Sequence, residues 1–480
     1  MATPYPLNAP LLSGPFEPIR MECECADLVV EGRMPAELQG TLYRIGPNPQ
    51  FAPLGAYNPL QGEGMVHAFE IRDGKVAYRN RWVRTERWRR ERAAGRALYA
   101  TTDPRGHDPS VAGTSGGGAA NTHIVMHAGR LLALEEGHRP VQMAAGTLET
   151  IGPFDFAGRL PGAMTAHPKV CPATGEMWFF TNFPNHRLDG AVMLHCATSG
   201  GELVRSIEID GPYPALIHDF AITREHVIFV VCPVTLSVDR LRAGGPPLAW
   251  EPDRSTFVGI LPRAEAGDGI RWFTAPTTMV WHTVNAWTKG DMVHLDVCQQ
   301  AAAAFPTADG SPTPEADHRQ HLARWTIDLT GDGTVSTRQL SETVCEYPRI
   351  DERHLGAPYR YAFVAALGGP GTGDLAHRGL GRYDLQSREM RLWRAGERRT
   401  VSEPVFVPRS AAADEGDGFL LATVFDEARN ASHLAVLDAT AIEAGPVARA
   451  HLDHRVPAGF HGSFVAGAPA NGPAPGLGTA

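Results

Sequence analysis

Short strand–turn–strand phrases recur along the whole chain, and they limit its possible folds more than any other feature. Each phrase combines β-branched or aromatic residues with a turn that contains Gly. The clearest are FEIRDGKVAYRN, VMHAGRLLALEE, VCPATGEMWFFT, AWTKGDMVHLDV, WTIDLTGDGTVSTR and GDGFLLATVFD. The 39 Pro and 51 Gly residues are spread over the 480 positions and leave little room for long helices. The sequence therefore predicts an all-β fold.

Many hairpins in one long chain favour sheets repeated around an axis over a two-sheet sandwich. Their spacing is irregular, so the sequence has no signature repeat of fixed length. We expect a β-propeller that forms a single domain over residues 1–480, with one short helical segment near 86–98. The two ends, 1–15 and 466–480, are rich in Pro, Gly and Ala and are expected to form loosely ordered tails.

Charge and cysteine content exclude several classes of protein. Lys and Arg number 44 against 53 Asp and Glu, a net charge of −9, which argues against nucleic acid as a partner. The seven cysteines are odd in number and include no CxxC pair, so we expect reduced thiols and a cytoplasmic location. The N-terminal segment lacks the charged and apolar regions of an export signal, and no window is apolar enough to predict a membrane span.

Four histidines lie in short apolar phrases, where a neutral imidazole needs a buried partner. They are His167 in TAHPKV, His218 in ALIHDFAI, His282 in MVWHTVNAW and His461 in AGFHGSFV. They are far apart along the chain, unlike the ligands of closely spaced zinc motifs, so they meet only if distant strands converge. A propeller allows this, because its inner strands all face one central channel. One metal ion is the simplest shared partner, and iron, zinc, copper and nickel all accept neutral imidazole.

Three glutamates occupy apolar or aromatic contexts in which a free carboxylate would be costly. They are Glu136 in LLALEEGHRP, Glu346 in VCEYPRI and Glu403 in SEPVFVPR. Metal-bound histidines commonly donate their second N–H to a carboxylate. A role as partner of a ligand imidazole therefore suits each glutamate, and so does a partly exposed place at a strand end.

Together the motifs resemble the carotenoid cleavage oxygenase family, the non-haem iron enzymes that split alkene double bonds with O2. The resemblance covers most of the chain and includes GTLYRIGPNPQF, GEGMVHAFEI, ANTHIVMHAGRLLALEEG, WHTVNAW, EYPRID and FHGSF. It implies a seven-bladed propeller with loops that form a dome over the substrate, and one Fe(II) on the axis without any organic cofactor. The implied iron ligands are His167, His218, His282 and His461.

The resemblance also implies how the ligands are oriented. Glu136 would orient His218, Glu346 would orient His282 and Glu403 would orient His461, whereas His167 would lack a carboxylate partner. The implied reaction inserts O2 across one C=C bond and gives two carbonyl products. The expected partners are O2 and a small apolar or aromatic alkene, with at most peripheral membrane contact and no inference about oligomeric state. The residues expected near the substrate are Glu135, Phe51, Phe305 and Phe464.

The stretches DPSVAG and WEPDRSTFVGILPR are similar to bacterial members that act on phenolic alkenes, such as isoeugenol, 4-vinylphenols and stilbenes. Those members carry a Tyr and a Lys that bind the substrate 4-hydroxyl. Here Glu135 stands in place of the Lys, and TTDPR at 101–105 contains no Tyr. Glu135 is either a base for the phenol proton or a solvated carboxylate.

Charges in the 235–250 loop, namely Asp239, Arg240 and Arg242, disfavour deep insertion into a bilayer. We therefore expect a soluble aromatic alkene as substrate, with an apocarotenoid as the rival. Two functions of other classes are alternatives to alkene cleavage. A hydrolytic propeller would hold Ca²⁺ with oxygen ligands, whereas the motifs here supply imidazoles. A catalytically silent iron-binding propeller would keep the same ligands.

Overall fold

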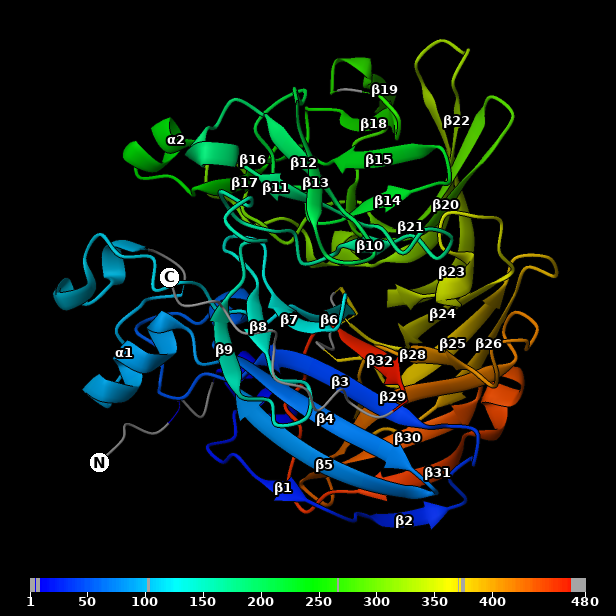
Figure 1. Ribbon diagram of the computed structural model, residues 1–480. Coiled ribbons are helices and arrows are strands. Elements are labelled where there is room, and N and C mark those ends of the chain that lie inside the picture. Colours follow the sequence, from blue (N-terminus) through cyan, green and yellow to red (C-terminus); the bar gives the residue numbers. More distant parts are fainter. Residues whose placement is uncertain are drawn as a thin grey trace.

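The computed structural model describes residues 5, 9–101, 104–265, 267–369, 371–372 and 376–467. Strands form most of its regular structure, and the described residues contain two short α-helices, α1 (Glu86–Ala94) and α2 (Val238–Arg242) (Figure 1). Five of the predicted strand–turn–strand phrases lie on antiparallel strand pairs. The sixth, GDGFLLATVFD, holds a turn and the single strand Gly418–Asp426, whose partner Val405–Pro408 precedes the phrase. The all-β prediction is confirmed.

Four sheets formed mainly by residues 24–275 follow one another in sequence order, and the first also includes a strand from residues 462–466. The first has the order β1 (Glu24–Cys25), β5 (Lys75–Trp82), β4 (Gly64–Arg72), β3 (Gly40–Pro47) and β32 (Gly462–Ala466). The second is β6 (His123–His127), β7 (Arg130–Leu134), β8 (Val141–Met143) and β9 (Thr150–Pro153). The third is β10 (Lys169–Val170), β11 (Met177–Asn182), β12 (Val192–Ala197) and β13 (Leu203–Ile209). The fourth is β14 (Phe220–Ile222), β15 (His226–Val231), β18 (Thr256–Pro262) and β19 (Arg271–Ala275).

Two larger sheets and one small hairpin complete the architecture. A seven-stranded sheet runs β20 (Met279–Lys289), β21 (Met292–Gln300), β22 (His321–Asp328), β23 (Val335–Arg349), β24 (Tyr361–Ala366), β25 (Gly379–Asp384) and β26 (Glu389–Arg394). The last sheet has the order β2 (Val29–Gly32), β31 (Pro446–His451), β30 (Ala431–Asp438), β29 (Gly418–Asp426) and β27 (Arg399–Val401), and β28 (Val405–Pro408) also pairs with β29. The hairpin pairs β16 (Val234–Leu236) with β17 (Leu248–Trp250).

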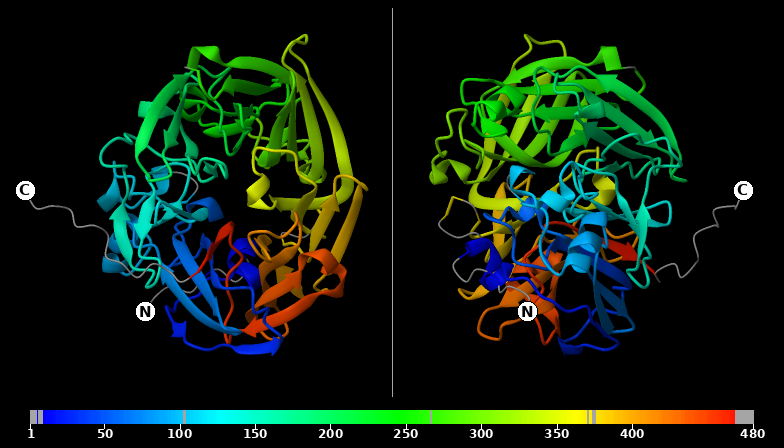
Figure 2. Two further views of the ribbon diagram at one scale, coloured as in Figure 1. Left: turned by 45° about the vertical axis from the view of Figure 1, so that its right-hand side comes forward. Right: turned by 90° about the vertical axis from the view of Figure 1, so that its left-hand side faces the viewer.

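The sheets are arranged in a ring about a common centre (Figure 2). Apolar side chains of neighbouring sheets pack face to face, as Leu132 and Phe179 do between the second and third sheets, and Ile260 and Leu295 between the fourth and fifth. Both ends of the chain close this ring. Strand β2 joins the last sheet by pairing with β31, and β32 joins the first sheet by pairing with β3.

Three segments differ from the simplest sequence expectation. The 235–250 loop is structured, because it holds α2 and the β16–β17 hairpin. Helix α1 ends before residue 98, because Gly95 adopts a left-handed conformation and donates its N–H to carbonyls of the last turn. Residues 10–12, within the expected N-terminal tail, form a 3-10 turn with Leu12 buried; residues 1–4, 6–8 and 468–480 lie outside the described residues.

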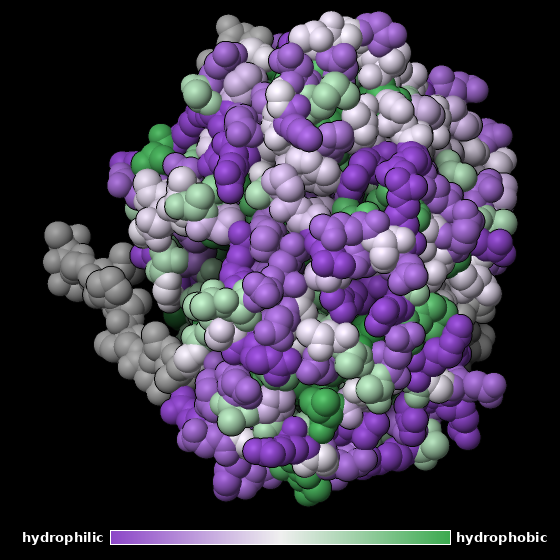
Figure 3. Space-filling view, turned by 90° about the vertical axis from the view of Figure 1, so that its right-hand side faces the viewer, coloured by the Kyte–Doolittle hydropathy of each residue, from purple (hydrophilic) through white to green (hydrophobic). Residues whose placement is uncertain are grey.

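Hydrophilic side chains cover most of the face shown in Figure 3, and apolar ones are scattered among them. Within the described part of the chain, no helix has the length and apolar character needed to cross a membrane.

Candidate metal centre

The four predicted histidines meet at one point. His167, His218 and His461 lie just before β10, β14 and β32, and His282 lies within β20. One ligand atom from each falls within 4.8 Å of those of the others. The Nε2 atom of His218 lies 3.1 Å from Nε2 of His167 and 3.3 Å from Nε2 of His282. Strands of four different sheets thus deliver one imidazole each.

Carboxylates contact three of these imidazoles on the side away from the shared point. Glu136 Oε1 lies 2.5 Å from Nδ1 of His218, and Glu346 Oε2 lies 2.7 Å from Nδ1 of His282. Glu403 Oε1 lies 2.9 Å from Nδ1 of His461. Because each Nδ1–H donates to a carboxylate, each Nε2 keeps its lone pair toward the centre. Among the described residues, no carboxylate contacts His167, so the pairing follows the pattern expected from the sequence.

Burial keeps two of the imidazoles neutral. It lowers the pKa of His167 well below its usual value, and the neighbouring histidines lower it further. Burial also lowers the pKa of His461 to about 4, against the opposite effect of Glu403. For His282 the lowering by burial is outweighed by the charge of Glu346, and the pKa is raised. The site therefore combines neutral nitrogen donors with carboxylates that favour positive charge.

Glu403 lies in a fully buried ionic network. Its Oε2 accepts hydrogen bonds from Arg44 Nη1 at 3.0 Å and from the Gly462 N–H at 2.9 Å. Its Oε1 also contacts Arg349 Nη1 at 3.4 Å. Burial raises the pKa of Glu403, but the two guanidinium groups and His461 lower it far more, so the carboxylate stays ionised.

Sequence reasoning missed these arginines. Arg44 lies in β3, whose eight residues are all buried, so a charged residue inside the apolar phrase GTLYRIGP was the available signal.

A second buried ion pair braces the strands that carry His218 and His282. Asp219 Oδ1 lies 2.8 Å from Lys169 Nζ. Its Oδ2 accepts hydrogen bonds from the N–H and the hydroxyl of Thr283, at 2.8 and 2.9 Å. Each of these three residues follows a centre histidine directly or by two positions. The pair therefore fixes the backbone from which the imidazoles project.

Aromatic side chains flank His218. The Trp281 ring packs edge-on against His218, with centroids 4.9 Å apart, and the Phe305 ring lies 6.0 Å from that of Trp281. Both rings are half-buried and pack beside Leu216 and Leu248. Phe305 thus contacts the ring that packs against His218, and Trp281 was missed although it directly precedes His282 in the sequence.

The other residues expected near the substrate have different surroundings. Glu135 is buried, accepts a hydrogen bond from the Gly137 N–H at 2.9 Å and contacts His138 Nδ1 through its other oxygen. Burial lowers the pKa of His138, but this contact with Glu135 raises it more. Phe464 packs against the apolar core between the first and last sheets, and Phe51 is half-buried.

The stretch 101–105, which contains no tyrosine, is only partly described by the structure. The Thr101 hydroxyl donates to the Ala56 carbonyl at 3.0 Å, whereas residues 102 and 103 lie outside the described residues.

Comparison with known proteins places this geometry in context. Residues 16–466 match the family model described as retinal pigment epithelial membrane protein. The isoeugenol monooxygenase of Pseudomonas nitroreducens is 36% identical over 95% of this chain and 98% of its own length. The crystal structure of Pseudomonas brassicacearum lignostilbene dioxygenase superposes with a TM-score of 0.92 at 34% identity, covering 97% of this chain and 100% of the other. A Synechocystis apocarotenoid oxygenase superposes with a TM-score of 0.84 at 28% identity, covering 94% and 98%.

Proposed function

Because the chain belongs to the family of the retinal pigment epithelial membrane protein and the carotenoid cleavage oxygenases, we propose that it cleaves one C=C bond of an alkene with O2 to give two carbonyl products. The observation that carries this proposal is the convergence of four buried imidazoles on one point, three of them held by carboxylates. The similarity over nearly the full length of an isoeugenol monooxygenase and a lignostilbene dioxygenase supports it.

We propose Fe(II) as the ion bound by His167, His218, His282 and His461. The donor set fits, because four imidazole nitrogens suit a divalent transition metal and the chain supplies no carboxylate ligand among the four. Bound there, iron would supply the O2 chemistry, which protein side chains lack. The chain's own task is to hold the imidazoles rigidly through Glu136, Glu346 and Glu403 and to keep water away by burial.

We further propose that the ring is a seven-bladed propeller forming a single domain over residues 1–480. The seven-stranded sheet then contributes two blades. The part of β23 up to Val344 pairs with β22, whereas the part from Cys345 onward pairs with β24. A separate apolar cluster, which includes Leu322 and Val364, packs the two halves of this sheet against each other.

We propose a soluble aromatic alkene of the isoeugenol, 4-vinylphenol or stilbene type as substrate. Trp281 and Phe305 offer aromatic rings beside His218, where a phenyl ring of the alkene would stack. The 235–250 loop is polar: the side chains of Asp239 and Arg242 are 92% and 76% exposed, and Arg240 turns back to pair with Glu251. An exposed ion pair at this place suits water better than a bilayer.

For phenolic alkenes, we propose that Glu135 and His138 together replace the lysine of related enzymes. The buried carboxylate of Glu135 orients the imidazole of His138, so the pair offers an acceptor for a phenol proton. Glu135 also directly precedes Glu136, whose carboxylate contacts His218. The free thiols of all seven cysteines are compatible with a cytoplasmic enzyme.

The test is aerobic incubation of the iron-loaded protein with isoeugenol, 4-vinylguaiacol, resveratrol and an apocarotenal, with the aldehydes identified by mass spectrometry. We expect cleavage of at least one phenolic alkene, with about one iron per chain. The variant His218→Ala should lose iron and cleavage, whereas His186→Ala, which alters an exposed histidine, should keep both. Cleavage of none of the four substrates would refute the proposed reaction, and cleavage of the apocarotenal alone would refute the substrate class.

A further inference from the structure

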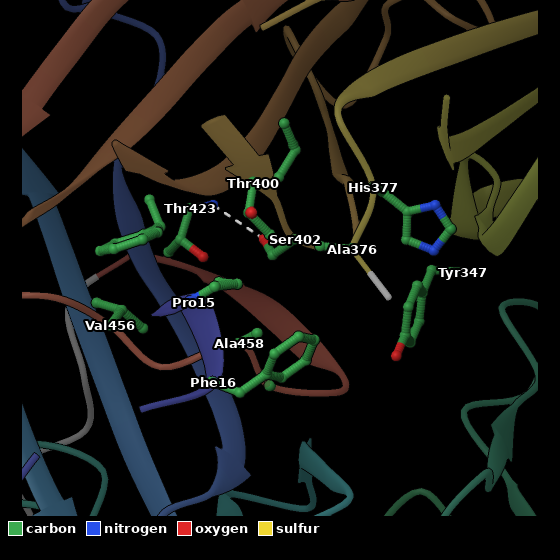
Figure 4. A pocket seen from close by; sticks show the side chains of 13 residues that line it. Pro15, Phe16, Tyr347, Ala376, His377, Thr400, Ser402, Thr423, Val456 and Ala458 are labelled. Carbon is green, nitrogen blue, oxygen red and sulfur yellow. Dashed lines mark hydrogen bonds between the residues drawn. The ribbon is translucent and has the colours of Figure 1, made fainter. Parts of the chain in front are cut away.

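A small cavity lies beside the metal centre, between the strands of the last sheet and the N-terminal turn Gly14–Phe16 (Figure 4). Its volume is about 50 Å³. Such a volume holds a few molecules of the size of water but no aromatic ring with its substituents. Tyr347, Ser402, Thr423, Phe16 and Ala458 are among its lining residues. We call it the Tyr347 cavity.

The ring of Tyr347 separates this cavity from the metal centre. Its centroid lies 5.7 Å from that of His282 and 5.4 Å from that of His461. Glu346, its neighbour in sequence, and His461 are each only 4% exposed, whereas Tyr347 is half-buried. The accessible part of Tyr347 therefore belongs to the cavity that it lines. The ring of Tyr347 is thus in contact with both the cavity and two of the four imidazoles.

The cavity wall is continuous with the groups that orient those imidazoles. Tyr347 follows Glu346, the partner of His282, and donates its backbone N–H to that carboxylate. Ser402 precedes Glu403, the partner of His461. The Ser402 hydroxyl accepts the N–H of Thr423 at 3.0 Å (Figure 4). A molecule in this cavity is thus only one layer of side chains away from the metal centre.

The lining favours small neutral molecules. No Asp, Glu, Lys or Arg is among the residues that line it in the described part of the chain. Hydroxyl groups, apolar side chains and the imidazole of His377 share the remaining wall. An ion would lose its hydration here without gaining a charged partner.

The backbone of Tyr347 is held in an uncommon conformation. Its φ of 53° lies in the left-handed region, which is costly for a bulky residue. The hydrogen bond to Glu346 helps to keep it there. With this conformation the ring lines the cavity and also packs against the imidazoles of His282 and His461.

We propose that the Tyr347 cavity delivers dioxygen to the four-histidine centre along a path separate from that of the alkene, with the Tyr347 ring as its door. This inference rests on the proposed function, in which dioxygen is the co-substrate. The two paths approach different imidazoles: the aromatic pair Trp281 and Phe305 lies against His218, whereas Tyr347 lies against His282 and His461. The cavity is too small for the alkene and large enough for a diatomic gas.

Xenon, a neutral apolar probe of similar size, tests the cavity directly. Crystals of the wild-type protein pressurised with xenon should show a xenon atom in the Tyr347 cavity. The variant Ala458→Phe, which fills the cavity, should show none, and Ala411→Phe, at an exposed site, should still show it. Absence of xenon from the wild-type cavity overturns the inference whether or not an alkene is cleaved.

Steady-state kinetics on the iron-loaded enzyme give the second readout. Ala458→Phe should raise KM for O2 at least about fivefold while KM for the alkene and the iron content stay unchanged. Thr423→Leu, a smaller filling of the same cavity, serves if the first variant does not fold. An unchanged KM for O2 in a folded, xenon-free variant overturns the delivery path. Failure of the wild type to cleave any of the alkenes offered would refute the proposed function. Xenon in the cavity together with an unchanged KM for O2 in the filled variant would refute only the delivery path.

Discussion

Replacing Glu403 by Gln should affect the protein more strongly than the same change at Glu346, although both carboxylates orient a centre histidine. Glu403 neutralises Arg44 and Arg349 within a buried network, and both its oxygens contact charged or N–H donors. In Glu346 the Oε2 atom accepts from His282, while Oε1 is buried with no hydrogen-bond partner among the described residues. Only the loss at 403 therefore leaves a buried guanidinium, that of Arg44, without its carboxylate, whereas Arg349 keeps Glu352.

The expected magnitude follows from this difference. Removing one partner of a buried ion pair costs about 3 to 5 kcal/mol of unfolding free energy. With an unfolding entropy of about 2.1 cal/mol/K per residue, the 480 residues give about 1 kcal/mol/K. Glu403→Gln should therefore lower Tm by about 3 to 5 °C. Glu346→Gln keeps an amide oxygen that can accept from His282, so Tm should fall by about 1 °C or less.

Differential scanning fluorimetry of the two metal-free variants measures the difference in Tm. Iron analysis and steady-state kinetics measure the effect on iron binding and turnover. Both variants should lose about 10- to 100-fold in iron affinity or turnover, because each frees a ligand imidazole. The pKa of Glu403 is lowered on folding, so its stabilisation is complete above the unfolded pKa and is lost as pH falls toward the folded value. The gap in Tm between wild type and Glu403→Gln should thus narrow below about pH 4.5. Equal Tm shifts for the two variants at neutral pH would refute the claim that Glu403, unlike Glu346, compensates a buried positive charge.

Further predictions concern the substrate side of the centre. Trp281→Ala should raise KM for an aromatic alkene by about tenfold, which corresponds to about 1.4 kcal/mol of lost ring contact. The control variant Trp272→Ala, on β19, should leave KM unchanged. A loss of kcat alone in Trp281→Ala would contradict a stacking role. Glu135→Gln should slow cleavage of 4-hydroxylated alkenes at least about tenfold relative to their methyl ethers, and Glu135→Lys should restore it. Equal loss on both substrate types would show that Glu135 is structural.

Local sequence patterns predicted most hairpins, because a phrase such as FEIRDGKVAYRN contains two strands and the turn between them, whereas GDGFLLATVFD contains only one strand. The four histidines and three glutamates were also predictable, since each stands in a distinctive phrase. Pairs made by residues far apart in sequence left no such local mark. Arg44 meets Glu403 only after the first and last sheets have come together. His138 was missed because its contact with Glu135 depends on how the chain turns after β7.

The position of β32 determines when the metal centre can form during synthesis of the chain. This strand closes the ring against β3, and His461 directly precedes it. During synthesis the segment carrying both leaves the ribosome after the other three histidines have emerged. A nascent or C-terminally shortened chain therefore has at most three of the four imidazoles and an unsealed first sheet. Only a chain in which β32 has paired with β3 therefore presents all four nitrogens to a metal ion.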